Sequence, residues 1–266
     1  MSAEALDAQR RVWTIGDYPI IASHLLPISV ETVEAVGIRP GDHVLDVGVG
    51  NGNAAIEAAR RGANVTGIDL TPAQIERARS RCADEGVEVE LRVGNAEQLD
   101  VPDASFDVVL SVMGVIFAPD HARAIAEMAR ACRTGGTVAI TTWAEGGWSN
   151  RWRSHAAHLV PAPPPGSPTP DEWADPDEVV ARFAAGGLRA TVERRPFAFQ
   201  FSSEAEALET FLGASGPYVQ FMETASRLGR ADEARSELRA ALAEANEAGD
   251  GTCRLRAPYL LAISHR

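Results

Sequence analysis

Residues 43–52, HVLDVGVGNG, join a short apolar run to a glycine-rich turn. The run from His43 to Val47 follows Pro40-Gly41, a pattern typical of a buried β-strand. The alanine-rich residues 54–61 end at Gly62 and predict a helix. A strand, a glycine turn and a helix in this order form a site for a nucleotide-like ligand. Glycines let backbone N–H groups approach the ligand, and a helix N-terminus favours negative charge.

The alternation of strand and helix continues to residue 143. It predicts a mostly parallel sheet with right-handed crossovers and helices on both faces, a doubly wound α/β fold. Ligands bind beyond the carboxyl ends of the strands in such sheets, so we expect the site just after Val47, Asp69, Val93 and Ser111. The further strands are expected at residues 64–69, 87–93, 106–112 and 137–143, and the helices between them at 72–85 and 120–132.

Two acidic residues and one asparagine bear on the choice of ligand. The dinucleotide fingerprint G-x-G-x-x-G requires glycine at position 53, which is Asn53 here. Asp46 lies inside the strand, where a pyrophosphate has no use for a carboxylate but an ammonium group does. Asp69 ends the next strand and suits the hydroxyls of a ribose, as an acid does in NAD sites. Asp69 by itself therefore does not distinguish NAD from a ribose-containing cofactor that carries an ammonium group.

A third signal follows the expected strand at residues 87–93. The sequence GNAEQL, residues 94–99, supplies the side-chain carbonyl of Asn95 and the N–H of Ala96 at the end of a strand. The carbonyl can accept from an adenine amino group, and the N–H can donate to a ring nitrogen. In order after the other two signals, this segment is interpreted as an adenine clamp.

Together these segments resemble the successive motifs of class I S-adenosylmethionine-dependent methyltransferases. The closest resemblance is to the small-molecule group that resembles the C-methyltransferases of ubiquinone and menaquinone synthesis. The family usually has Asp where this chain has Asn95, a departure that keeps the acceptor. The motifs cover roughly residues 37–145 and are VLDVGVGNGN, GIDLTP, VGNAEQLDVPDASFDVVLS and RACRTGGTVAITTW.

The resemblance implies a Rossmann-like sheet of seven strands whose last strand is antiparallel. It also implies S-adenosylmethionine as cofactor and S-adenosylhomocysteine as product. By position, Asp46 lies near the methionine amino group, Asp69 holds the ribose, and Ser111 lies beside the sulfonium. The further cofactor contacts that it implies are Gly48, Gly50 and Gly52 at the methionine end, Leu70 against the adenine, and Asn95 and Ala96 around the adenine.

The rest of the chain is expected to supply a cover and the closing strands. We expect an N-terminal helical segment covering the site, a cofactor-binding core, a helical cap for the substrate, and two long strands that complete the sheet. A proline-rich linker, PAPPPGSPTP, occupies residues 161–170. The boundaries of these four parts, in the same order, are 1–36, 37–145, 146–188 with 202–250, and 189–201 with 253–266.

Methyl transfer from a sulfonium needs positioning of the acceptor and, for some acceptors, a base. His155 and Tyr218 are weak candidates for a catalytic role. His155 and His158 share a helix face and either could serve as a base, but a surface or packing pair is the favoured interpretation, and no third residue is spaced for a metal site. His121 is expected to face solvent. The candidate substrate contacts are Tyr18, Met113, Phe117 and Trp148, although core packing is an alternative for each aromatic residue.

Composition excludes several classes of protein. The formal net charge is −12, which disfavours binding to nucleic acid. The three cysteines form no C-x-x-C pair and suit reduced thiols, and the N-terminus does not resemble a signal peptide. We expect a cytoplasmic protein without membrane insertion, a monomer or a homodimer, that acts on a small molecule.

The function predicted is transfer of a methyl group to an O, N or C atom of a small aromatic or secondary-metabolite substrate. The main alternative is an enzyme of the same fold that retains the cofactor but catalyses a non-methylating step such as cyclisation. A non-catalytic cofactor-binding protein and a nicotinamide oxidoreductase are further alternatives. Asn53 and Asp46 weigh against the oxidoreductase.

Overall fold

The computed structural model describes residues 3–162 and 169–266, so most of the linker expected at residues 161–170 lies outside the described residues. The first half of the chain contains α1 (Ala3–Thr14), α2 (Tyr18–Val36), β1 (His43–Val47), α3 (Asn53–Arg60), β2 (Asn64–Asp69), α4 (Pro72–Asp84), β3 (Glu90–Val93), β4 (Phe106–Val112), η1 (Val115–Phe117) and α5 (His121–Ala131). The second half contains β5 (Cys132–Trp143), α6 (Trp148–Ala156), η2 (Ala157–Leu159), η3 (Pro170–Trp173), α7 (Pro176–Ala185), β6 (Ala190–Arg195), β7 (Ala198–Phe201), α8 (Glu204–Ala214), α9 (Gly216–Arg227), α10 (Ala231–Ala245), β8 (Cys253–Arg256) and β9 (Tyr259–His265).

The described residues divide into two compact units, each built from separate segments of the chain. The unit that we call the sheet unit comprises residues 25–142, 169–195 and 259–266, and the helical unit comprises residues 3–24, 143–162 and 196–258. These boundaries differ from the expected ones. The expected N-terminal segment 1–36 divides within α2, and η3 and α7 belong to the sheet unit although they fall in the expected cap segment 146–188.

The sheet unit contains the predicted seven-stranded sheet, in the order β3-β2-β1-β4-β5-β9-β6. β1 pairs in parallel with β2 and with β4, and the parallel pairing continues outward to β3 and β5. β9, the last strand of the chain, pairs antiparallel with β6. The strand order reverses between β1 and β4, and this reversal is the point at which sheets of this kind bind ligands. The α/β fold predicted from the sequence is confirmed.

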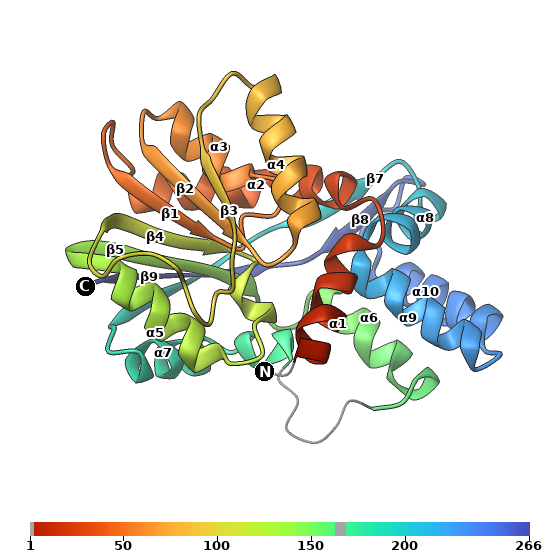
Figure 1. Cartoon of the computed structure of the whole chain (residues 1–266). Helices are drawn as coiled ribbons and strands as arrows, with labels where there is room; N and C mark the ends of the chain where they lie inside the picture. The colour runs from red at the N-terminus through yellow and green to blue at the C-terminus, as the bar shows by residue number, and fades with distance from the viewer. Residues whose placement is uncertain (1–2, 163–168) are drawn as a thin grey trace. The chain divides into compact units, whose positions relative to one another are not determined.

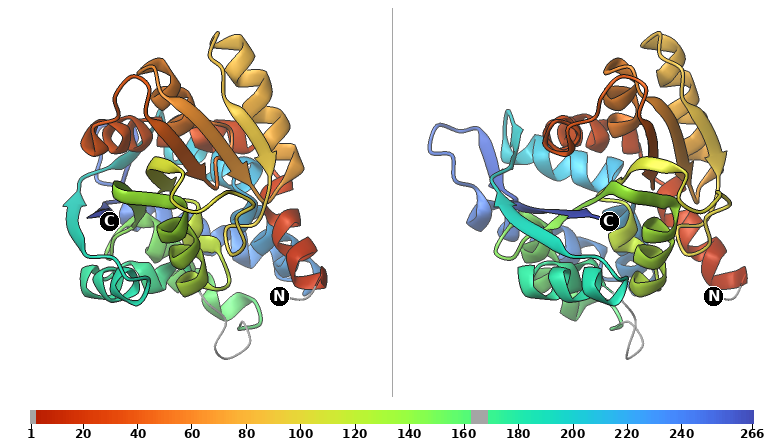
Figure 2. Two further views of the ribbon diagram at one scale, coloured as in Figure 1. Left: turned by 60° about the vertical axis from the view of Figure 1, so that its left-hand side comes forward. Right: turned by 90° about the vertical axis from the view of Figure 1, so that its left-hand side faces the viewer.

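The central strands are apolar because helices cover both faces of the sheet. Figure 1 shows α3 and α4 on one face and α5 and α7 on the other, and the two views of Figure 2 show the same layers. On the first face the core joins Val33 of α2, Ala55 of α3 and Ile75 of α4 to Val44 and Leu110 of the sheet. Burial of this apolar surface stabilises the frame that carries the carboxyl-edge loops.

The helical unit has an aromatic core of its own. Trp148 of α6 is buried, and its ring lies 5.6 Å from that of Phe211 in α8. Tyr218 of α9 stacks on Trp152 with the ring centroids 4.1 Å apart. Within this unit β7 and β8 form a separate antiparallel pair. The helical unit therefore has a packed core separate from that of the sheet unit.

Helix α1 is packed tightly into the helical unit. A Cβ atom at Gly216, the first residue of α9, would lie 1.9 Å from the carbonyl oxygen of Val12. Arg11 also forms an ion pair with Glu223 of α9 at 2.8 Å. The close approach of the two helices explains why glycine begins α9.

The two long strands that the sequence predicts are each divided at a proline. Residues 189–201 form β6 and β7, which belong to different sheets, and Pro196 lies between them. Residues 253–266 divide in the same way into β8 and β9 on either side of Pro258. Proline cannot donate to a strand ladder, so it marks the places where each segment changes partner.

Helix α2 is long and apolar enough to cross a membrane by length and composition alone. A buried core helix passes the same test. Ile28, Thr32 and Val33 are fully buried within the sheet unit. Burial in the core accounts for part of the apolar composition of α2, since 39% of its apolar window is buried.

Candidate functional site

The glycine turn after β1 is shaped by three left-handed glycines. Gly48, Gly50 and Gly52 have φ values of +76°, +54° and +91°, a region that residues with a Cβ atom rarely adopt. The N–H groups of Gly48 and Val49 both donate to the carbonyl of Ile68 in β2, at 2.8 and 3.0 Å. Helix α3 begins directly after this turn, and among the residues that the structure describes no side chain caps its N-terminus. The turn thus brings a helix N-terminus to the carboxyl edge of the sheet, where it favours an anionic or polar ligand group.

Asp46 is buried inside β1, with 1% of its surface exposed. One carboxyl oxygen accepts from the N–H of Ala55, whereas Oδ2 has no hydrogen-bond partner within the described residues. Burial raises the pKa of Asp46 to about 7, the Ala55 N–H lowers it, and repulsion from Asp69 raises it further. An unpaired buried carboxylate is costly, so a cationic ligand group would complete the site. This geometry fits the ammonium of S-adenosylmethionine.

Asp69 closes β2 and faces the glycine turn. Its Oδ2 accepts from the N–H of Gly50 and its Oδ1 from the N–H of Thr71, each at 2.9 Å. Burial raises the pKa of Asp69, and the N–H groups of Thr71 and Gly50 oppose that rise. Each carboxylate oxygen can accept more than one hydrogen bond, so both keep capacity for ribose hydroxyls. The half-buried Leu70 follows directly, where the resemblance places an adenine contact.

The loop that contains Asn95 and Ala96 is a compact turn at the end of β3. The side-chain carbonyl of Asn95 accepts from the N–H of Glu97 at 3.0 Å, and the backbone carbonyl of Asn95 accepts from Gln98, also at 3.0 Å. The N–H of Gly94 donates to the carbonyl of Asp69 at 2.9 Å, which ties this loop to β2. The Asn95 side chain therefore shapes the turn, and its carbonyl keeps a second acceptor position for an adenine amino group.

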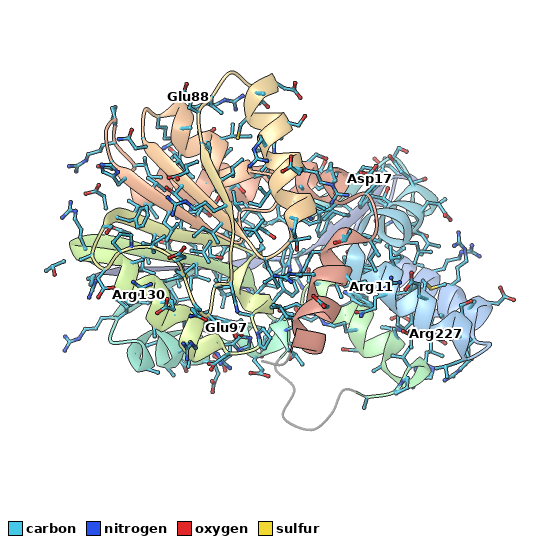
Figure 3. The ribbon with its side chains drawn as sticks, in the orientation of Figure 1. Arg11, Asp17, Glu88, Glu97, Arg130 and Arg227 are labelled. Carbon is cyan, nitrogen blue, oxygen red and sulfur yellow. The ribbon has the colours of Figure 1, made fainter. Side chains whose placement is uncertain are left out.

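Charged side chains of α5 hold this loop in place, and none of them is among the site residues expected from the sequence. Arg123 donates to the carbonyl of Glu97 at 2.6 Å. Arg130 donates to the carbonyls of Leu99 and Val101 at 2.9 and 2.8 Å. Figure 3 labels Glu97 in the loop and Arg130 on α5. Arg123 and Arg130 are seven residues apart and therefore lie on the same face of α5. This spacing is the signal in the sequence that points to their role.

Glu127 and Glu97 complete the attachment of the loop. Glu127 accepts from the N–H of Leu99 at 2.8 Å, and the Arg130 side chain holds the pKa of Glu127 below its usual value. The buried Glu97 accepts from the N–H of Asp120 at 2.8 Å, just before α5 begins. The expected adenine loop is thus fixed at several points along its length.

The turn after β4 contains three residues that the sequence assigns to the site. Ser111 is fully buried, and its hydroxyl bonds within the described residues go to backbone, donating to Val47 and accepting from Val115. Met113 is buried and has a left-handed backbone with φ +54°. Phe117 is half-buried at the end of η1. The structure brings all three to the carboxyl edge of β4, and their contacts with cofactor or substrate stay a prediction.

The remaining candidates belong to the helical unit. Trp148 and Tyr218 are both buried. Burial raises the pKa of the Tyr218 hydroxyl well above its usual value. His155 lies on α6 with its Nε2 3.4 Å from Glu244, and the Tyr18 ring meets Trp13 edge to face at 6.0 Å. A role in catalysis or substrate contact stays a prediction for each candidate.

His121 differs from the expectation that it faces solvent. The side chain is buried, with its ring 5.1 Å from that of Trp173. Its Nδ1 lies 3.2 Å from the guanidinium of Arg182. Burial lowers the pKa of His121, and the positive charge of Arg182 lowers it further. No local pattern predicts this burial, because η3 and α7, which cover His121, follow it by about 50 residues.

A metal site requires several ligating side chains in one place. In residues 3–162 and 169–266, no three His, Cys, Asp or Glu side chains come together in a group that could hold a metal ion.

Comparison with known sequences places this chain near several methyltransferases. Residues 45–140 match the family described as a methyltransferase domain. An uncharacterized protein of Mycobacterium tuberculosis is 43% identical over 175 residues, which are 65% of this chain and 64%, just under two thirds, of that protein. A phosphatidylethanolamine N-methyltransferase of Cereibacter sphaeroides is 37% identical over 142 residues, 53% of this chain and 68% of the relative. A 27-O-demethylrifamycin SV methyltransferase of Amycolatopsis mediterranei is 41% identical over 106 residues, 39% of each chain.

Solved structures of low sequence identity share the fold. A putative methyltransferase of Bacillus halodurans has a TM-score of 0.61 at 18% identity, covering 89% of this chain and 97% of its own. The [4+2]-cyclase SpnF has a TM-score of 0.57 at 19% identity, with coverage of 91% and 80%. A geranyl diphosphate methyltransferase in complex with SAM has a TM-score of 0.53 at 21% identity, with coverage of 91% and 85%. The likeness to these structures concerns the fold alone.

Proposed function

Because this chain belongs to the class I S-adenosylmethionine-dependent methyltransferases, we propose that it transfers a methyl group to an O, N or C atom of a small substrate. The observation that carries the proposal is the buried Asp46 carboxylate beside the glycine turn, whose Oδ2 has no hydrogen-bond partner within the described residues, with Asp69 at the end of the next strand. A cationic amino acid joined to a ribose matches these two acids. S-adenosylmethionine is the cofactor with those parts.

The residues of the sheet unit would bind the cofactor by separate groups. Asp46 would hold the ammonium, the turn from Gly48 to Gly52 the methionine end, and Asp69 the ribose hydroxyls. Asn95 and Ala96 would bind the adenine, with Leu70 against its ring. When bound, S-adenosylmethionine supplies a methyl group on a sulfonium that is already an activated leaving group. The protein then has to orient the acceptor in line and exclude water, and an acceptor that is already nucleophilic needs no base.

The substrate is proposed to be a small aromatic or secondary-metabolite molecule. The accepting atom stays open in this proposal, because one relative is named as a phosphatidylethanolamine N-methyltransferase and another as a 27-O-demethylrifamycin SV methyltransferase. Similarity to the quinone C-methyltransferases, which the sequence motifs suggest, adds a carbon acceptor to this range. His155 and Tyr218 stay as candidates for a base.

The proposal is tested with S-adenosylmethionine that carries label in its methyl group. The full chain is incubated with that cofactor and one acceptor at a time: a naphthoquinol, a catechol and an aryl amine. Label in an extracted acceptor, absent from a parallel reaction with the Asp69→Ala variant, is the expected result. Conversion of an acceptor while all label stays on the cofactor would contradict methyl transfer. That outcome would favour a non-methylating step such as cyclisation.

A further inference from the structure

Ser111 connects two loops at the carboxyl edge of the sheet. Its hydroxyl donates to the carbonyl of Val47, the last residue of β1, at 2.6 Å. The same oxygen accepts from the N–H of Val115, the first residue of η1, at 3.0 Å. The side chain is fully buried, and both bonds go to protein backbone. The Ser111 hydroxyl therefore links β1 to η1 through these two hydrogen bonds.

The backbones of the two loops approach each other with no space for a side chain between them. A Cβ atom at Gly48 would lie 2.9 Å from Cα of Gly114. A Cβ atom at Gly114 would lie 2.8 Å both from Oγ of Ser111 and from the carbonyl oxygen of Val47. Real Cβ atoms are not found at such distances, so only glycine fits at both positions. Ser111 sits at the corner where these two glycines meet.

Met113 shows that the turn after β4 is held in an unfavourable conformation. A left-handed backbone is rare for a residue with a side chain and persists where the surrounding structure enforces it. The N–H of Met113 donates to the hydroxyl of Thr141 in β5 at 3.1 Å. The turn is therefore fixed to β1 by Ser111 and to β5 by Thr141. We call the contact between Gly48 and Gly114 the Gly48 corner. Removal of either hydrogen bond allows the turn to relax away from this corner.

We propose that Ser111 is a positioning residue that holds the Gly48 corner in the shape required to bind the methionine end of the cofactor. Its hydroxyl acts through the backbone of Val47 and Val115 and does not touch the cofactor. This role replaces the direct contact beside the sulfonium that the family resemblance implies. The inference rests on the cofactor site and does not depend on which substrate receives the methyl group.

The first test compares Ser111→Ala with Ser264→Ala. Ser264 is a matched control because it is a buried serine in β9 of the same sheet, and its hydroxyl makes no hydrogen bond within the described residues. The dissociation constant for S-adenosylhomocysteine is measured by calorimetry in the full chain, at a temperature where denaturation curves show each variant folded. Ser111→Ala is expected to weaken binding at least about tenfold, and Ser264→Ala less than about twofold.

Equal affinity of the folded Ser111→Ala variant and the wild-type protein would overturn the proposal, even if the variant unfolds more easily. Such a result would mean that the hydroxyl contributes to stability alone. Failure of the wild-type protein to bind S-adenosylhomocysteine would also overturn it, since nothing would remain to be positioned. A wild-type protein that binds the compound but transfers no methyl group would contradict the proposed function and leave this inference standing.

A second pair of variants keeps the test decisive if Ser111→Ala does not fold. Thr141→Val removes the hydroxyl that accepts from Met113 while it keeps the shape of the side chain, and Thr141→Ser keeps the hydroxyl. Affinity for S-adenosylhomocysteine is expected to fall about threefold or more in Thr141→Val and to stay near the wild-type value in Thr141→Ser. Equal affinities in these two variants would contradict the proposed role of the turn.

Discussion

The buried Asp46 carboxyl makes the stability of the ligand-free protein depend on pH in a way that can be worked out from the structure. Burial raises its pKa from 3.8 to about 7. Between these two values the folded protein holds one proton more than the unfolded chain. The free energy of unfolding therefore falls as the pH rises through this window. Between pH 5 and pH 8 this one group removes about 3 kcal/mol.

The Asp46→Asn variant isolates this contribution. Asparagine keeps an acceptor for the N–H of Ala55 but carries no titrating proton. The free energy of unfolding is measured by urea denaturation at pH 5, 6, 7 and 8, without ligand, for the wild-type protein and the variant. The difference between them should change by about 3 kcal/mol across the series, with the wild-type protein losing more stability at high pH. Asn in place of the exposed Asp100 controls for the loss of one negative charge.

The same carboxyl predicts how cofactor binding varies with pH. An ammonium stabilises the charged form of Asp46, so binding below pH 7 must release the proton. Affinity for S-adenosylhomocysteine should therefore fall by about tenfold per pH unit below pH 7 in the wild-type protein. In Asp46→Asn it should be weaker and independent of pH over this range. The reasoning would be refuted if the free energy of unfolding varied with pH in the same way in the wild-type protein and in Asp46→Asn, and if the pH dependence of binding were also the same in both.

Three further predictions concern the ribose acid, the adenine loop and the helical unit. Asp69→Ala removes the acceptor of two backbone N–H groups and of the ribose hydroxyls, so calorimetry should show cofactor affinity about 100-fold weaker or worse while circular dichroism stays unchanged. Arg130→Met removes bonds to two carbonyls of the loop after β3 and should lower the free energy of unfolding by about 1–3 kcal/mol in urea. Gly216→Ala forces a Cβ atom against α1 and should cost about 1–3 kcal/mol. Gly213→Ala should be neutral or stabilising, because its Cβ atom would have open space beyond its chain neighbours and the backbone of its own helix within the described residues. Equal stability of these two variants would contradict the close packing of α1 on α9.

Much of the sheet is predictable because its signals are local. The apolar run before Gly48 and the run from Phe106 to Val112 are continuous, since both strands lie in the middle of a covered sheet. The glycines of the turn and Asp69 follow strands directly, so the alternation of elements places them at one edge. The structure confirms the fold, and it finds the Asp46 carboxylate buried and the Asp69 carboxylate partly buried at that edge.

Other features depend on residues far apart in the chain and have no local signal. The hydrogen bond from the Ser111 hydroxyl to the carbonyl of Val47 joins residues 64 positions apart. The burial of His121 depends on Trp173 and Arg182, which lie 52 and 61 residues further along. The division of the two long strands is different, because Pro196 and Pro258 mark it in the sequence. Those two prolines are a local signal for the points at which the chain passes between the sheet and the helical unit.

The most direct measurement is a calorimetric titration of the full ligand-free protein with S-adenosylhomocysteine, repeated with the Asp46→Asn variant. One binding event per chain, lost or strongly weakened in the variant, is the predicted result, because the buried carboxylate supplies the partner for the ammonium. No heat of binding at millimolar concentration of the compound, or equal binding by the two proteins, would contradict the assignment of the glycine turn and Asp46 to this cofactor.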